Sequence, residues 1–249
     1  MSIAVDWTTL WARVSPWEGW LREEQARALW EGAQRVPDDG QIVEIGSYHG
    51  KSTAVLASAA PAGATVVAID PHTGDDRAPG LWKGTEEMGV ADHDRFVGNL
   101  EAAGVTDRVR HVREFSQAAQ PQVAGVVDLL YVDGAHGYAP ASSDIVEWGG
   151  RVGPGGEMFI HDVYNSVFVT LAVLRHLSCS RRWRYLGRYQ SLAHYRRENV
   201  GVRGMGANLA GHLASMPWFA RNLFVKVLRK LGLERFGRVV GYRPGDGCY

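Results

Sequence analysis

The 249-residue sequence is poor in cysteine and has no run of about 18 apolar residues. Its two cysteines, Cys179 and Cys248, fit neither the spacing of a metal site nor a disulfide framework. The first residues also lack the basic and apolar segments of a signal peptide. These absences predict a cytoplasmic, reduced protein without a transmembrane segment.

An excess of charge of either sign is missing as well. Lys and Arg number 27 and Asp and Glu also number 27, whereas dedicated nucleic-acid binders are usually strongly basic. The balance hides a split, because residues 1–162 carry a net charge of −12 and residues 163–249 a net charge of +12. Hydrophobic residues make up 45%, which excludes disorder and predicts a sizeable core.

Short apolar runs alternate with helical stretches over much of the chain. The runs are Gln41–Gly46, Ala64–Asp70, Arg108–Arg113, Val126–Asp133 and Gly156–Asp162, and the helical stretches are Lys51–Ala60, Ala91–Ala103, Ser116–Gln120 and Tyr138–Gly149. This alternation predicts an α/β fold, a doubly wound and mostly parallel sheet with helices on both faces. A helix over Val163–Ser178 and two antiparallel strands, Trp183–Arg188 and Ser191–Arg197, bring the expected number of strands to seven.

The segments before and after this alternating region are expected to be helical extensions of the main domain. Ser15-Pro16 resembles a helix start, which predicts one helix running to about Arg35. We therefore expect an N-terminal helical extension over 1–37, a main domain over 38–199 and a basic helical tail over 200–249. The extension is rich in Trp, and it could cover a site, pack on the core or form a dimer surface.

The loop after the first expected strand reads Glu44-Ile-Gly46-Ser-Tyr-His-Gly50-Lys51-Ser52. Ligands of open α/β sheets bind at the carboxyl ends of the strands, so this loop is a candidate site. A dinucleotide G-x-G-x-x-G loop would need glycines at two positions that hold other residues. A phosphate-binding G-x-x-x-x-G-K-[ST] loop would need one more residue between the glycines.

A third interpretation fits the loop better. The pattern Glu44-x-Gly46-x-x-x-Gly50 resembles the S-adenosylmethionine loop of class I methyltransferases. Asp70 ends the second strand 20 residues after Gly50, where a carboxylate can accept the ribose hydroxyls of a nucleotide cofactor. Enzymes that use NAD carry an acid at the same place, so Asp70 alone leaves both cofactors open.

Downstream motifs make the resemblance specific. The stretch Asp133-Gly-Ala-His136-Gly-Tyr138 is followed by a helix, by Pro154-Gly-Gly and by the strand end His161-Asp162. In this order, over about residues 38–165, the chain resembles class I methyltransferases that methylate sugars and macrolide glycosides, relatives of the catechol-type enzymes. The resemblance implies a seven-stranded Rossmann-like sheet and S-adenosylmethionine as the cofactor. The cofactor-binding residues that it implies are Glu44, Gly46, Ser47, Tyr48, Gly50, Ser52, Asp70, Pro71, His72, Phe115, Ser116 and Asp133.

The reaction that the resemblance implies needs a group that removes a proton from the acceptor hydroxyl. His136 follows the fourth strand and is largely neutral at pH 7, so it is our candidate for the general base, with Asp133 and Asp162 as the other catalytic residues. A histidine that merely holds its loop is the alternative.

A metal is the second way to make a hydroxyl reactive. Asp133, His161 and Asp162 end two neighbouring strands and could bind Mg²⁺. Metal-dependent relatives carry two acids, or an acid and an amide, at the fifth strand end, so the pair His161-Asp162 departs from their pattern. Without a metal, Asp133 would face the cofactor and Asp162 would orient His136 or the substrate.

The expected acceptor is a hydroxyl of a sugar, glycan or glycoside, as in polysaccharide biosynthesis. A catechol- or phenol-methylating enzyme, a P-loop nucleotide-binding protein and a non-catalytic binding module are the alternatives.

Residues 71–90 form a long polar connection that could act as a lid, with Trp82 stacking on a sugar ring. The tail contains an amphipathic basic helix over Trp218–Leu231. It could pack on the acidic half of the same subunit or of another subunit in a homodimer. Alternatively, it could bind an anionic substrate or lie on a membrane surface.

Overall fold

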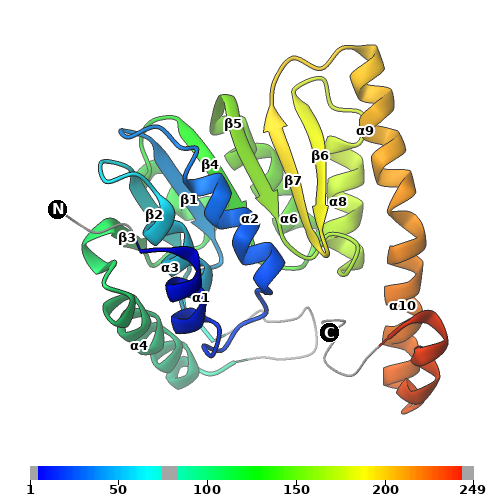
Figure 1. Ribbon diagram of the computed structural model, residues 1–249, viewed down its shortest axis with the longest axis horizontal. Helices are drawn as coiled ribbons and strands as arrows, with labels where there is room; N and C mark the ends of the chain where they lie inside the picture. The colour runs from blue at the N-terminus through cyan, green and yellow to red at the C-terminus, as the bar shows by residue number, and fades with distance from the viewer. Residues whose placement is uncertain (1–4, 75–83, 243–249) are drawn as a thin grey trace.

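A computed structural model describes residues 5–74 and 84–242 of the chain. These residues form a seven-stranded sheet with the strand order β3-β2-β1-β4-β5-β7-β6 (Figure 1). The first five strands are parallel, and β7 runs antiparallel to both β5 and β6. The predicted doubly wound, mostly parallel sheet of seven strands is therefore confirmed.

The strand bounds lie close to the predicted runs, because most of the strands are apolar and buried along most of their length. The exceptions are β3 and β6, each with a single buried residue. The strands are β1 (Gln41–Ile45), β2 (Thr65–Ile69), β3 (Val109–Val112), β4 (Val127–Val132), β5 (Val152–Ile160), β6 (Trp183–Tyr189) and β7 (Leu192–Arg197). The α-helices are α1 (Trp7–Val14), α2 (Glu23–Ala33), α3 (Lys51–Ala59), α4 (Glu86–Ala103), α5 (Ser116–Ala119), α6 (Tyr138–Ser143), α7 (Gly149–Arg151), α8 (Val167–Leu177), α9 (Val202–Ala214) and α10 (Met216–Lys230).

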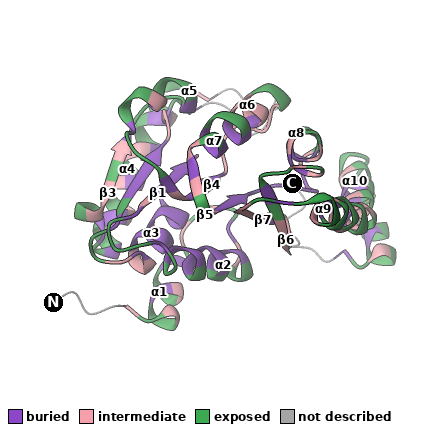
Figure 2. Cartoon of the chain, turned by 90° about the horizontal axis from the view of Figure 1, so that it is seen from above, coloured by how far each residue is buried: buried purple, intermediate pink, exposed green. Residues whose placement is uncertain are grey.

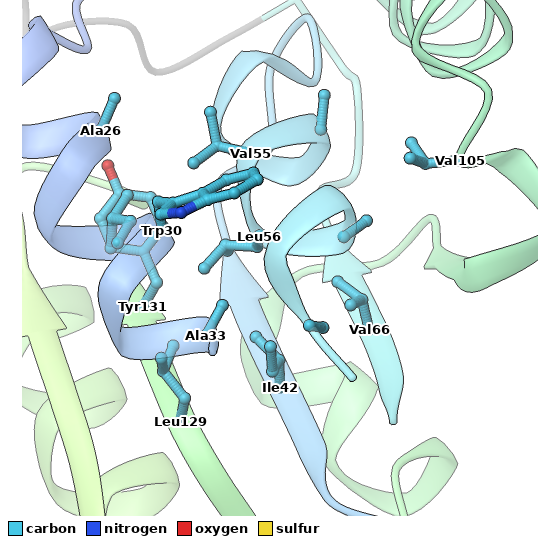
Figure 3. Close-up of a cluster of buried hydrophobic side chains, with 14 of the residues drawn as sticks. Ala26, Trp30, Ala33, Ile42, Val55, Leu56, Val66, Val105, Leu129 and Tyr131 are labelled. Atoms are coloured by element: carbon cyan, nitrogen blue, oxygen red, sulfur yellow. The ribbon is translucent and has the colours of Figure 1, made fainter. Parts of the chain in front are cut away.

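Helices cover both faces of the sheet, which gives the domain two hydrophobic cores (Figure 2). One core joins α1–α4 to the side chains of Ile42, Val66 and Leu129 (Figure 3). The other joins α5, α6 and α8 to Val43, Val67 and neighbouring strand residues. Alternate residues of each strand thus enter opposite cores, as expected for a parallel sheet covered on both sides.

The order in which successive strands join the sheet reverses between β1 and β4. After β1 it continues to β2 on one side of the sheet, and after β4 it continues to β5 on the other. The loops that follow β1 and β4 therefore separate, and they leave a crevice at the carboxyl ends of these strands. The loop after β1 and the candidate base His136 both lie at this edge.

The predicted single helix from Ser15 to Arg35 is wrong. Asp6, not Ser15, caps a first helix, and its carboxylate accepts a hydrogen bond from the backbone N–H of Thr9. Ser15 ends α1, and the chain then turns before α2 begins at Glu23. The Lys51 ammonium donates to the carbonyls of Ser15 and Trp17, a contact distant in sequence that stabilises the break.

Two further helices differ from the sequence prediction. The helix expected over Tyr138–Gly149 is interrupted by a π-helical turn, Asp144–Trp148. The helix expected from Val163 begins four residues later, at Val167, after a turn in which Asp162 and Tyr164 have positive φ. Part of the predicted lid, including Trp82, lies outside the described residues, and α4 starts within its last part at Glu86.

The C-terminal arm comprises α9, α10 and the 3₁₀ segment Glu234–Val240, and it lies along the β6 edge of the sheet (Figure 1). Asn208 of α9 bonds the backbone of Trp183 and Tyr185, and the Arg188 guanidinium lies 4.3 Å from the Trp218 ring centroid. Within this chain the arm therefore packs on strands of its own basic half, whereas the sequence favoured the acidic half. In the described part of the chain, no helix is both long and apolar enough to cross a membrane.

Candidate active site

A cavity of about 600 Å³ opens at the carboxyl ends of the strands. Residues that follow β1, β2, β3, β4 and β5 all contribute to its wall, as the topology of the sheet requires. The predicted site residues that line it are Gly46, Tyr48, Asp70, Pro71, His72, Phe115, Ser116, Asp133, His136, His161 and Asp162. The structure thus brings most of the predicted cofactor and catalytic residues to one cavity.

The loop after β1 approaches the end of β4 very closely. Gly46 has a φ of +85°, and a Cβ on it would lie 2.1 Å from the carbonyl oxygen of Asp133. Only glycine fits there, because both the backbone conformation and the contact exclude a side chain. The next residue, Ser47, is buried, and its hydroxyl has no hydrogen-bond partner among the described residues. Ser47 belongs to the loop that borders the cavity, but it is not itself among the residues that line it.

Asp70 is fixed by the backbone on both sides. Its Oδ2 accepts the backbone N–H of Tyr48 at 2.8 Å, and its Oδ1 accepts that of His72 at 2.9 Å. A carboxylate has about four lone-pair sites, so acceptor capacity remains for hydroxyls in the cavity. The two amides therefore place Asp70 without saturating it.

Backbone strain concentrates at this cavity. Tyr48, His72 and Asp162 line it with φ values of 45°, 46° and 56°, a region that side chains rarely adopt. Each such residue costs about 1–3 kcal/mol unless its surroundings hold it in place. The hydrogen bonds to Asp70 and Asp162 supply that restraint here.

Beyond β3, Ser116 forms a hydrogen-bonded pair with Asp144, and the sequence analysis predicted only Ser116 as a site residue. Phe115 and Ser116 line the cavity as predicted residues, and the Ser116 hydroxyl donates to Asp144 Oδ1 at 2.5 Å. Burial raises the pKa of Asp144 to about 6. Asp144 was missed because it lies in the π-helical turn, 28 residues from Ser116 in sequence.

Four predicted cofactor residues do not line the cavity: Glu44, Ser47, Gly50 and Ser52. Glu44 is fully buried and accepts hydrogen bonds from the hydroxyls of Ser52 and Thr53, so it joins β1 to α3. Burial raises the pKa of Glu44 to about 8. Gly50 begins α3 with a φ of +77°.

The P-loop alternative loses its main support in this geometry. The lysine of such a loop reaches phosphates, whereas Lys51 donates to the carbonyls of Ser15 and Trp17 at 3.1 and 2.9 Å. Its ammonium also lies 5.6 Å from the centroid of the Trp11 ring. Lys51 thus anchors the N-terminal extension, and it is not among the residues that line the cavity.

His136 and Asp162 form a pair on the opposite side of the cavity. His136 Nε2 lies 2.7 Å from Asp162 Oδ2, and Asn165 donates to the other carboxylate oxygen of Asp162 at 3.0 Å. Burial lowers the pKa of His136, but the hydrogen bond and charge of Asp162 outweigh burial and raise the pKa above 6.5. His136 Nδ1 is buried and has no hydrogen-bond partner among the described residues.

His161 lies between two carboxylates beneath this pair. Its Nδ1 is 3.1 Å from Asp133 Oδ1 and 3.6 Å from Asp162 Oδ1. Burial opposes the charged imidazole, but the charges of Asp133 and Asp162 raise the pKa of His161 to about 9. The remaining Asp133 oxygen accepts the Tyr131 hydroxyl at 2.7 Å.

These contacts do not fit the predicted metal site. In residues 5–74 and 84–242, no three His, Cys, Asp or Glu side chains are arranged to hold a metal ion. The oxygens of Asp133 and Asp162 already face protein donors, and the imidazole of His161 occupies the space between the two carboxylates. Protonated His161 balances the charge that a cation would otherwise balance.

Aromatic side chains form another part of the wall, and one of them comes from the Trp-rich N-terminal extension. Trp20 of the N-terminal extension lines the cavity, with its ring centroid 5.3 Å from that of Tyr48. Trp7, Trp11 and Trp17 pack against the core instead. The extension therefore both packs on the core and borders the site. The sequence carried a signal in its clustered Trp residues but could not tell which of them reached the cavity.

Comparisons with known proteins agree with this geometry. The family model of a methyltransferase domain matches residues 43–163. The chain resembles the solved structure of an O-methyltransferase from Bacillus cereus in complex with SAH, with a TM-score of 0.55, 15% identity and coverage of 79% of this chain and 94% of that one.

Two other solved structures are similar. The O-methyltransferase NovP gives a TM-score of 0.54 at 15% identity, covering 71% of this chain and 80% of that chain. A methyltransferase from Geobacter sulfurreducens gives 0.52 at 18% identity, covering 72% and 82%. At these identities the likeness establishes the shared fold. Residues 43–163 therefore match the model of a methyltransferase domain, and the chain shares the fold of known O-methyltransferases.

Proposed function

We propose that this methyltransferase domain transfers a methyl group from S-adenosylmethionine to a hydroxyl oxygen of a sugar or glycoside. The observation that carries the proposal is the His136–Asp162 pair at the cavity, with one ring nitrogen held at 2.7 Å and the other, which is buried, without a partner among the described residues. That arrangement suits a general base, because the held nitrogen fixes the ring and no described protein group competes with the acceptor hydroxyl for the other, which the acceptor must reach.

The residues around the cavity fit the cofactor. Asp70 retains acceptor sites for two ribose hydroxyls. The loop after β1, which would meet the methionine carboxylate, contributes Gly46 and Tyr48 to the cavity wall. Phe115, Ser116 and Asp144 provide an apolar surface and polar groups for adenine. When bound, S-adenosylmethionine supplies a methyl group already activated by a positively charged sulfur.

The protein then has two tasks, to position the acceptor and to remove its proton. A sugar hydroxyl is weakly acidic and needs a strong base. Asp162 accepts the N–H at Nε2, which leaves the lone pair at Nδ1 of His136, and its charge raises the pKa of the ring. After proton transfer, the carboxylate of Asp162 stabilises the imidazolium that forms. Because the carboxylates fit no metal, we expect this reaction to proceed without Mg²⁺.

The assay that tests the proposal combines binding and turnover. Calorimetry should detect binding of S-adenosylhomocysteine (SAH), and mass spectrometry should detect methylated products in a panel of sugars, glycosides, catechols and phenols. Activity should be unchanged by EDTA. Loss of activity in EDTA with recovery in Mg²⁺ would show that the carboxylates bind a metal after all, and binding of ATP instead of SAH would revive the nucleotide-binding alternative.

A phenol or catechol acceptor is the second candidate, and the aromatic wall of Trp20, Tyr48 and Phe115 favours it equally. Phenols are far more acidic than sugars, so their methylation should depend less on His136. A comparison of the two acceptor classes in wild-type and His136→Ala enzyme therefore separates the candidates. SAH binding without any methylated product would favour a non-catalytic binding module.

A further inference from the structure

The C-terminal arm carries apolar residues on its outer face as well as on its inner face. The inner face, which contacts the body of the protein, combines the buried polar residues Asn208, His212, Ser215 and Asn222 with the buried apolar residues Val225 and Leu228. The outer stripe of the arm consists of the exposed residues Val202, Leu209, Leu213, Phe224, Val227 and Leu231. Surface helices normally turn their apolar stripe toward the core and their polar residues toward water.

Hydrogen bonds show that the inner face is properly packed. Asn208 exchanges bonds with Trp183 and Tyr185 at 2.7 and 2.9 Å. His212 Nδ1 lies 2.6 Å from the Tyr164 hydroxyl, and Asn222 donates to the Tyr164 carbonyl at 3.0 Å. These buried polar groups would be left unsatisfied if the arm turned over. The apolar stripe therefore faces outward for structural reasons.

The outer stripe is continuous along one side of the arm. Its residues follow steps of three and four, or sums of such steps, and α9 and α10 lie nearly end to end (Figure 1). Val202, Leu213 and Leu231 are 79%, 58% and 65% exposed, and Phe224 is 47% exposed. An exposed apolar stripe of this length marks a surface that binds a partner or a membrane. At 1.5 Å per residue, the 29 residues from Val202 to Lys230 span roughly 43 Å.

The charge of the arm indicates whether the stripe binds a second protein copy or a membrane surface. Residues 199–233 contain no Asp or Glu, and they contain five Lys or Arg residues. Arg203 and Lys230 are exposed about a quarter turn from the stripe, at its two ends. Two copies of this face brought together would place bases against bases. A surface of anionic lipid headgroups would complement the bases and also accept the apolar side chains.

We propose that the outer stripe of the C-terminal arm binds an anionic membrane surface, with α9 and α10 lying in the plane of the lipid headgroups. The apolar residues enter the boundary between headgroups and acyl chains, while Arg203 and Lys230 contact phosphates. The arm rests on the membrane without crossing it, which agrees with the lack of a membrane-spanning helix among the described residues. Membrane attachment is independent of the proposed methyl transfer.

Flotation of the full-length protein with lipid vesicles tests this proposal. The protein should float with vesicles of phosphatidylcholine mixed with phosphatidylglycerol, and binding should weaken at high salt. Binding to pure phosphatidylcholine should be at least about tenfold weaker. Failure to bind the mixed vesicles, or equal binding to both kinds, would overturn the proposal.

Two sets of variants locate the binding surface. Phe224→Ser with Val227→Ser should weaken binding to mixed vesicles by at least about tenfold, because both side chains lose apolar area. Val126→Ser, at an exposed valine outside the arm, is the matched control and should bind normally. Unchanged SAH affinity and circular dichroism would show that the double variant is folded.

Arg203→Gln with Lys230→Gln should weaken binding by about 25-fold, since each base near the membrane contributes a factor of about five. Arg27→Gln with Arg95→Gln, at two exposed bases outside the arm, removes the same charge as a control. Equal loss in both pairs would mean that total charge, not the arm, determines binding. A dimer that Phe224→Ser with Val227→Ser dissociates would assign the stripe to a second copy and overturn the lipid proposal.

Discussion

The two walls of the cavity are built from different chemistry. The binding wall, comprising Gly46, Asp70, Phe115 and Ser116, holds its groups mainly by backbone amides and one hydroxyl–carboxylate bond. The reacting wall, comprising Asp133, His136, His161 and Asp162, is a network of four titratable groups at 2.7–3.6 Å. Under the proposed function, this difference predicts that cofactor affinity and turnover depend on separate sets of residues and can be changed one at a time.

The largest expected effect comes from the reacting wall. His136→Ala should lower kcat for sugar acceptors by about 10²–10⁴-fold, because it removes the proposed base. SAH affinity should stay near the wild-type value, since the binding wall is untouched. Steady-state kinetics and calorimetry measure the two quantities, with His176→Ala as a matched histidine variant on α8. A parallel loss of affinity and turnover would mean that the two walls are not separate.

The reverse pattern is expected for the binding wall. Asp70→Ala should weaken SAH binding by about 10- to 100-fold, because hydrogen bonds to a carboxylate contribute about 1.5–3 kcal/mol. At saturating cofactor, kcat should remain within a few-fold of wild type. Calorimetry and a cofactor titration give both values. A normal SAH affinity would remove Asp70 from the cofactor site.

The pH dependence of turnover probes the reacting wall more finely. The pKa of His136 is raised above 6.5 and the base must be neutral, so wild-type kcat should rise with pH through a midpoint above 6.5. Asp162→Asn removes the carboxylate that raises this pKa. It should lower the midpoint and reduce kcat by about tenfold or more. A reduced kcat with an unmoved midpoint would assign Asp162 a purely structural role.

The smallest effect is expected beneath the binding wall, at Glu44. Burial raises its pKa to about 8, so the folded protein retains a proton that the unfolded chain releases near pH 4.5. This group therefore lowers stability as the pH rises from about 4.5 to about 8. Glu44→Gln cannot ionise, and its Tm should fall less steeply over that range, whereas Glu31→Gln at an exposed site should follow wild type. An unchanged slope in Glu44→Gln would show that Glu44 is already ionised in the folded protein.

Local signals in the sequence predicted the strands but failed where distant contacts decide the structure. The apolar runs of β1 and β4 predicted strands because strands buried on both faces are apolar along most of their length. Ser15 resembled a helix cap, yet its carbonyl instead accepts a bond from Lys51, which is 36 residues away. The pairing of Ser116 with Asp144 likewise depends on a π-helical turn that no local pattern indicates.

The C-terminal arm shows a second limit of sequence patterns. Periodicity over Trp218–Leu231 predicted an amphipathic helix, and α10 confirms it. However, a period of 3.6 residues shows only that a helix has two faces, not which of them is buried. In α10 the buried face carries Asn222, Val225 and Leu228, and the hydrogen bond from Asn222 to the Tyr164 carbonyl helps to fix that orientation.

The inner face of α10 also sets a limit on how this chain can be shortened. Asn222 and Lys226 donate to the carbonyls of Tyr164 and Asn165, in the turn that follows Asp162, and Asn165 in turn holds Asp162. A protein cut after β7 would keep every residue of both cavity walls but lose the donors for those two carbonyls. The last fifth of the chain therefore supports the turn beside the proposed base. Removing it would alter the surroundings of Asp162 and His136 at the proposed catalytic site.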